Sequence, residues 1–119
     1  MNIDYEVTLT AVAAIDQQDT FNDVVKKVTW LIGFFDTDNP TIKSNAGVES
    51  YLNTDSLSSD TYVPYANVTH TQILQWALDA EGGTAFLDQL LEGGHAANLE
   101  KLIADASFTE KDISVLADA

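Results

Sequence analysis

Residues 24–35 have the sequence VVKKVTWLIGFF, in which β-branched and aromatic side chains predominate. Such side chains favour a β-strand over a helix. One parity of the segment carries five apolar residues: Val24, Val28, Trp30, Ile32 and Phe34. The other parity carries three more: Val25, Leu31 and Phe35. Because successive side chains of a strand point to opposite faces, we expect a central strand that is covered at least partly on both faces.

The segments on either side predict two flanking strands. From Ile3 to Ala13, apolar residues alternate with acidic residues and threonines, and this period of two is typical of a half-buried antiparallel strand. The turn-type residues 16–20 (DQQDT) then favour a hairpin connection. After a second turn signal at 36–40 (DTDNP), a weaker alternation from Ile42 to Leu52 predicts a third, edge-like strand.

Past Asn67 the apolar spacing changes to the period of 3.6 residues that is typical of helices. Thr69 and Gln72 match a capping box, and Val68 with Ile73 matches its hydrophobic staple. The first helix is therefore expected to begin after Thr69 and to end at the glycine pair 82–83.

Shorter helical segments are expected after this glycine pair. Thr84 can cap a second helix that stops at the glycine pair 93–94, and a third helix is predicted over about 95–105. Thr109 with Asp112 can cap a last turn. That turn carries two apolar residues: Ile113 and Leu116.

Strands come first and helices after, which indicates an α+β fold: an N-terminal three-stranded antiparallel sheet, a meander, packed against C-terminal helices. A parallel sheet is not supported, because no helical pattern separates the strand candidates. At 119 residues the chain is expected to form a single domain, 1–119. Its strands are expected over about 3–52, a loop over 53–67 and helices over 68–117.

Aromatic residues are expected to hold these parts together. Trp30 and Trp76 each fall on an apolar stripe, so both are predicted to lie in the core rather than at a partner-binding surface. Tyr62, Val63 and Tyr65 surround Pro64 and are expected to pin the loop to the domain.

The net charge excludes several kinds of partner. The chain has 19 acidic residues against 5 lysines and no arginine, which gives a formal charge of -14. Nucleic-acid binding requires basic side chains that displace counterions, so we expect no contact with nucleic acid. Anionic membrane surfaces are disfavoured for the same reason. The acidity itself indicates solubility, or alternatively a partner with a basic surface or mimicry of a nucleic acid.

Cysteine is absent, so disulfides and thiolate metal ligands cannot contribute to stability. No apolar stretch approaches the roughly 20 residues that span a bilayer, and residues 1–6 are neither basic nor apolar. We therefore expect the chain to stay in the cytoplasm where it is made, unless an assembly carries it elsewhere.

No catalytic, cofactor-binding or metal-binding residue is predicted, and no cofactor is expected. The sequence lacks the GxSxG, Walker A and GxGxxG motifs, which indicates a protein that is not an enzyme. His70 and His95 are isolated at predicted helix starts, so both are interpreted as surface residues rather than metal ligands.

Asp36 and Asp38 have the alternate spacing that opens a calcium-binding loop. The rest of that pattern fails, because Thr41 occupies the sixth position, where glycine is needed, and Gly47 the twelfth, where glutamate belongs. The segment is interpreted as a solvated turn, and weak calcium binding by the two aspartates stays open.

Three motifs resemble a family of small uncharacterised proteins from tailed bacteriophages: 23–30 (DVVKKVTW), 62–65 (YVPY) and 68–76 (VTHTQILQW). The likeness spans about residues 3–80. In that family a strand ending in valine-x-tryptophan precedes a further strand, an aromatic-Pro-Tyr element and a capped helix with a tryptophan. The resemblance implies a phage origin and assigns no chemistry.

The combined expectation is a non-enzymatic phage protein that acts through protein-protein contacts, as a minor virion component or an assembly accessory. It would be found in the host cytoplasm or the virion, with a virion or host protein as its partner. The alternative is an acidic modulator of a host factor, including a DNA mimic, and an enzyme that uses carboxylates alone comes third. The oligomeric state stays open, although the edge-like third strand can pair with another copy.

Overall fold

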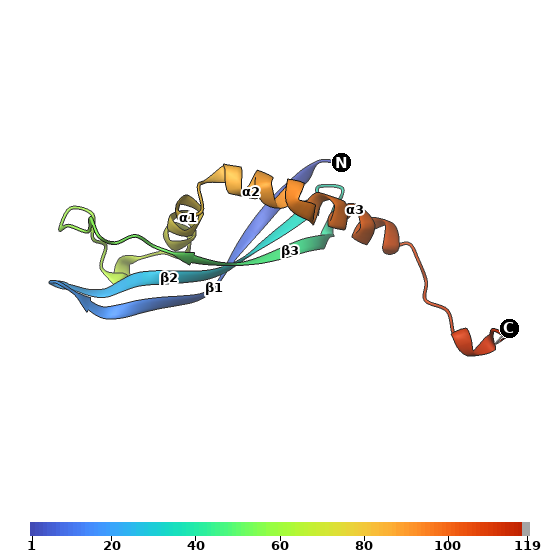
Figure 1. The fold of residues 1–119 in the computed structure, drawn as a ribbon, viewed down its shortest axis with the longest axis horizontal. Coiled ribbons are helices and arrows are strands. Elements are labelled where there is room, and N and C mark those ends of the chain that lie inside the picture. Colours follow the sequence, from blue (N-terminus) through green and yellow to red (C-terminus); the bar gives the residue numbers. More distant parts are fainter. Residues whose placement is uncertain (118–119) are drawn as a thin grey trace.

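The computed structural model describes residues 1–117 and measures 72 × 30 × 22 Å. An antiparallel sheet in the order β1-β2-β3 runs along the molecule, and the helices α1, α2 and α3 follow one another over one of its faces (Figure 1). The predicted α+β fold, a three-stranded meander packed against C-terminal helices, is therefore confirmed.

The strands are longer than the alternation predicts. They are β1 (Ile3–Gln18), β2 (Phe21–Asp36) and β3 (Asn39–Tyr51). Beyond Ala13 a register shift lets β1 continue, so that Ala14 pairs with Val25 and Ile15 with Val24. This shift leaves Lys26 of β2 unpaired, whereas β1 has its own unpaired residue, Thr10, between Leu9 and Ala11. Because a β-bulge resets the parity of the strand that carries it, strict alternation along β1 breaks at Thr10. The predicted turn at 16–20 accordingly shrinks to Asp19 and Thr20.

The helical half begins near the expected positions. Its elements are η1 (Tyr65–Asn67), α1 (His70–Ala80), α2 (Thr84–Leu90), η2 (Leu91–His95), α3 (Ala96–Asp105) and η3 (Ile113–Val115). Gly82 and Gly83 end α1 as predicted, since their N–H groups donate to the carbonyls of Asp79 and Leu78. Within residues 1–117, no helix combines the length and apolarity that crossing a bilayer requires.

The predicted stop at the second glycine pair is a kink instead of an end. Gly94 has a φ of 141°, outside the helical region, yet the chain passes directly from η2 into α3. One residue with a left-handed φ, which glycine tolerates, redirects the helix without a loop. The third helix itself lies where it is predicted.

Of the three predicted helix caps, the cap of α1 is confirmed, whereas those of α2 and of the last turn need correction. The Thr69 hydroxyl oxygen accepts a hydrogen bond from the Gln72 N–H at 3.2 Å, as the capping box predicts. The prediction that Thr84 caps α2 is wrong, because Gly83 is the N-cap and Thr84 is already helical. At the last turn the capping side chain is Asp112, whose carboxylate accepts from the Ser114 N–H at 2.9 Å. Thr109 lies outside that turn.

The core lies between one face of the sheet and the helices. Four side chains of β2 are at most 1% exposed: Val28, Trp30, Ile32 and Phe34. The helices cover them with buried side chains of their own: Ile73, Ala77, Leu87 and Leu99. On the other face Leu31 and Phe35 are only half-buried, and an ion pair of 2.8 Å joins Lys43 Nζ to Glu6 Oε1 across the strands.

Two buried serines of β3 fasten the helices to the sheet. The indole N–H of Trp30 donates to Ser50 Oγ at 2.9 Å, and the Ser50 hydroxyl donates to Glu81 Oε1 at 2.9 Å, just after α1. Six residues earlier in β3, Ser44 Oγ accepts a hydrogen bond of 2.9 Å from the side-chain amide of Asn98 in α3. Polar groups in the core are thus paired, and each pair fixes a helix at one point along the strand.

The Ser50→Ala variant tests the first of these fastenings. It leaves the buried Trp30 N–H without its acceptor, so we expect the free energy of unfolding to fall by about 1–3 kcal/mol. Urea denaturation followed by tryptophan fluorescence measures the change. Ser59→Ala, at an exposed position of the loop, is the matched control and should leave the stability unchanged. Equal stability of the two variants would contradict the role given to Ser50.

The Thr69→Ala variant tests the cap of α1. Without the hydroxyl oxygen the Gln72 N–H loses its acceptor, and we expect a loss of about 0.5–2 kcal/mol in urea denaturation. Thr71→Ala, on the exposed surface of the same helix, should leave the stability unchanged or raise it slightly, because alanine favours helices. A loss of similar size in both variants would argue against capping as the cause.

Candidate interaction site

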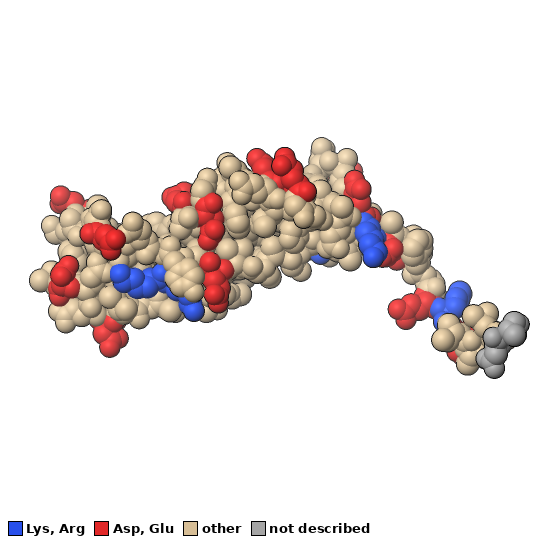
Figure 2. Space-filling view, viewed as in Figure 1, with Lys and Arg blue, Asp and Glu red and all other residues tan. Residues whose placement is uncertain are grey.

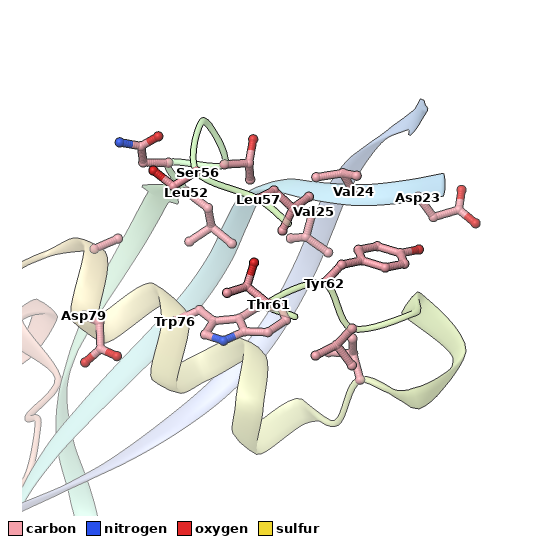
Figure 3. Close-up of a pocket in the computed structure, with 15 residues that line it drawn as sticks. Asp23, Val24, Val25, Leu52, Ser56, Leu57, Thr61, Tyr62, Trp76 and Asp79 are labelled. Atoms are coloured by element: carbon pink, nitrogen blue, oxygen red, sulfur yellow. The ribbon is translucent and has the colours of Figure 1, made fainter. Parts of the chain in front are cut away.

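A cavity of about 490 Å³ opens between the start of β2, the loop after β3 and the helix α1 (Figure 3). Its wall is mostly apolar: Val24, Val25, Leu52, Leu57, Tyr62, Val63, Val68, Trp76 and Ala80. A volume of this size falls within the range of pockets that enclose a bound group. The cavity is therefore the strongest candidate for a site of recognition.

The loop is held over the sheet by Tyr62. Its hydroxyl donates to the Asn22 carbonyl at 2.5 Å, and its ring centroid lies 4.7 Å from that of Phe21. The prediction that Tyr62 pins the loop is confirmed. Val63 is half-buried and lines the cavity. Tyr65 is exposed, so the prediction that it also holds the loop is wrong.

A polar cluster fixes the start of the same loop. The Lys26 ammonium donates to Gln18 Oε1 at 2.5 Å and to the Thr54 hydroxyl. The Gln18 side-chain amide donates in turn to the Thr54 carbonyl at 2.8 Å. Since Thr54 also lines the cavity, this cluster joins the cavity wall to both strands of the first hairpin.

Trp76 and two carboxylates give the cavity its chemical character. Trp76, which is expected in the core, is half-buried and contributes its indole to the wall, while Trp30 is in the core as predicted. Asp23 and Asp79 lie toward opposite ends of the cavity (Figure 3). An aromatic and aliphatic interior between two carboxylates suits an apolar group that carries a positive charge beside it.

A second hollow, of about 310 Å³, lies on the other side of α1. It is lined by α1 together with the edge strand β1, through Leu74 and Leu78 on one side and Tyr5 and Val7 on the other. Helix α1 therefore separates two hollows, and its Trp76 side belongs to the larger one.

The histidines differ in their surroundings. His70 is exposed at the start of α1, as predicted. The interpretation of His95 as an ordinary surface residue is wrong: its Nδ1 lies 2.8 Å from Ser44 Oγ, and its ring lies 5.4 Å from that of Phe34. The kink at Gly94 directs this ring toward the sheet.

The contact between Ser44 and His95 has the distance of a nucleophile and its base, but its position is structural. Ser44 is only 1% exposed, so a substrate cannot reach its oxygen, which also accepts the amide hydrogen bond of Asn98. In the described part of the chain, residues 1–117, no group of three His, Cys, Asp or Glu side chains is arranged to hold a metal ion.

The interpretation of the acidic segment at the end of β2 as a turn is confirmed, with one change. Asp36 is buried rather than solvated. Its Oδ1 accepts from the Asp38 N–H at 3.3 Å, and its Oδ2 accepts from the Asn39 side-chain amide at 3.2 Å. The carboxylate that was the candidate calcium ligand thus closes the turn, and weak calcium binding by Asp36 and Asp38 stays a prediction.

The model of a family described as "Domain of unknown function (DUF7936)" matches residues 2–115. The chain belongs to this family. Neither a curated protein nor a solved structure matches it significantly. The expectation of an uncharacterised family is therefore confirmed, and the family assigns no activity to the cavity.

Reasoning from the sequence did not identify the cavity. Its acidic residues, Asp23 and Asp79, lie far apart in the chain, and neither belongs to a spacing that predicts a site. The available signal was indirect: the motifs at 23–30, 62–65 and 68–76 each supply residues of the wall, such as Val25, Tyr62 and Trp76.

The Tyr62→Phe variant tests whether the loop closes the cavity as described. Removal of the hydroxyl leaves the Asn22 carbonyl without this donor, so we expect amide hydrogen exchange to become faster over residues 53–63 and the stability to fall by about 0.5–1.5 kcal/mol. Tyr65→Phe, at an exposed ring outside the cavity wall, is the control. Unchanged exchange rates in Tyr62→Phe would show that other contacts hold the loop.

Proposed function

We propose that the protein is a non-enzymatic contact module that binds a partner protein through the cavity beneath the loop 53–63. One observation carries the proposal: an apolar cavity, with the indole of Trp76 in its wall, lies between the carboxylates of Asp23 and Asp79. Tryptophan in a partly enclosed pocket is typical of the residues that dominate binding energy in protein interfaces.

The distribution of charge favours a partner segment with a basic residue beside its apolar anchor. On the face seen in Figure 2, acidic groups lie over the helices, the loop and the strand ends, with few lysines between them. Such a surface attracts basic partners over long distances and repels acidic ones. The cavity then makes the short-range contact with the apolar anchor of the partner segment.

The resemblance to tailed-phage proteins supports a more specific role. The motifs that carry the resemblance converge on the cavity wall, where Val24, Tyr62 and Trp76 come from three different segments. We assign the protein to phage assembly, as a minor virion component or an accessory that acts in the host cytoplasm.

An acidic modulator of a host factor is the second candidate, and the charge of -14 favours it. A DNA mimic would present carboxylates at regular intervals along the molecule. In Figure 2 the acidic groups form separate clusters with uncharged surface between them, which favours the contact module.

Two measurements test the assignment. Mass spectrometry of purified particles should detect the chain, and its absence would remove the virion role. Binding of the purified partner should weaken by about 2 kcal/mol, roughly thirtyfold, in Ala80→Trp, because the new ring fills the cavity. Ala80 is exposed at the end of α1, so the variant should fold. Ala85→Trp, on the exposed side of α2, should bind like the unchanged protein, and equal binding by both variants would exclude the cavity.

A further inference from the structure

The first half of β1 is an open edge of the sheet. In the described part of the chain, residues 1–117, β1 pairs with β2 alone, and this pairing runs without a register shift from Ile3 to Leu9. Neither proline nor lysine, two residues that commonly protect an edge strand, occurs within residues 3–9. This stretch therefore offers regular backbone to a further strand.

Alternate residues of the stretch direct their backbone N–H and C=O groups away from β2. The Asn2 carbonyl accepts from the Thr37 N–H at 2.9 Å, so it faces the β2 side, as do the backbone groups of the even-numbered residues that follow. The backbone groups of Tyr5 and Val7 face the open side instead. Accordingly, the Tyr5 N–H donates to Asp4 Oδ1 at 2.8 Å rather than to β2. An added strand pairs with backbone groups of this kind.

The same two residues line the hollow of about 310 Å³ beside α1. Tyr5 and Val7 are 41% and 36% exposed, although both pair with buried residues of β2 and share their face of the sheet. Leu74 and Leu78 of α1 border the hollow from the other side and are half-buried. We call this hollow the β1 groove. Because it runs beside open backbone groups, a strand added to β1 places every second side chain in it.

Charge indicates which side chains such a strand carries. The residues that line the β1 groove are all uncharged, so apolar side chains suit it. On the opposite face of β1, Asp4 and Glu6 are exposed, and Glu6 also pairs with Lys43. A neighbouring strand places its intervening side chains beside these carboxylates, where opposite charges are favoured and like charges are not. The matching segment therefore alternates apolar residues with lysine or arginine.

A second copy of the chain does not match this edge. Two paired β1 edges would bring their own carboxylates onto one face, and copies with a charge of -14 repel one another. None of the five lysines stands in a run that alternates apolar and basic residues. The charge pattern thus favours a different protein as the occupant.

We propose that β1 binds an extended segment of a partner protein by strand addition, with apolar side chains in the β1 groove and basic side chains beside Asp4 and Glu6. The unpaired Thr10 interrupts the regular edge, so the added strand covers residues 3–9. Helix α1 separates the β1 groove from the cavity beneath the loop 53–63. Binding at the edge is therefore independent of the proposed function of the cavity.

The probe for this site is a labelled synthetic peptide in which valines alternate with lysines, and fluorescence anisotropy with the full chain measures its affinity. Val7→Pro removes an outward N–H and leaves the bonds to β2 in place, while Thr71→Trp fills the β1 groove from an exposed position of α1. Each variant should weaken binding by about tenfold. Two matched controls should bind like the unchanged protein: Val7→Ile, which keeps the N–H, and His70→Trp, outside the groove.

Two further measurements identify the mode of binding. Amide hydrogen exchange, resolved by NMR, should become slower at Val7 when the peptide is bound and change little at Glu6, whose N–H already faces β2. Asp4→Asn keeps an acceptor for the Tyr5 N–H but removes the charge, and it should weaken binding by about two- to fivefold. A peptide in which valines alternate with glutamates should not bind.

The proposal is overturned if the valine-lysine peptide does not bind, or if a peptide of the same composition without the alternation binds equally well. Unchanged affinity in both Val7→Pro and Thr71→Trp would overturn it too. If Ala80→Trp abolishes binding instead, the peptide occupies the cavity, which supports the proposed function and excludes strand addition. Dimers of the unchanged protein in sedimentation velocity that Val7→Pro abolishes would identify a second copy as the occupant, against the proposal.

Discussion

The burial of one face of β2 is the constraint on which the rest of the structure depends. Val28, Trp30, Ile32 and Phe34 are almost fully removed from water, and no other row of the sheet is covered so completely. At roughly 1.5–3 kcal/mol for each large side chain, this row is the main source of stability in a chain without disulfides. The two serines of β3 then fix α1 and α3 along the row, because the Ser50 hydroxyl donates to Glu81 and Ser44 Oγ accepts from Asn98.

The length of that row separates the ends of the molecule. A sheet of three long strands, with helices placed one after another along it, cannot close into a sphere: its 16-residue strands alone span about 53 Å. The chain after α3 projects beyond the sheet and brings the extent to 72 Å (Figure 1). The cavity therefore forms where the loop and α1 meet the first hairpin, while the last helix leaves from the opposite end. The chain after α3 continues outward from that end and keeps the side chains of Phe108, Ile113 and Leu116 exposed.

The parts that sequence reasoning predicted are those set by neighbours in the chain. The parity of residues 28–34 and the Thr69 cap depend on residues a few positions apart, and both are confirmed. The parity fails at Val25, which joins the core in place of Val24 because Lys26 is unpaired. The continuation of β1 beyond Ala13 was missed because the bulge at Thr10 changes the parity of the strand without any local mark in the sequence. The inward position of His95 and the cavity depend on contacts between distant segments, which periodicity does not encode.

The backbone of Gly94 has a mechanical consequence. With a φ of 141° it sets the angle between α2 and α3, and so the direction in which the chain leaves the sheet. A residue with a side chain there would be strained and would favour a straighter rod, lifting Asn98 and His95 away from Ser44. The course of every described residue after α2 therefore depends on one backbone position, which only glycine occupies without strain.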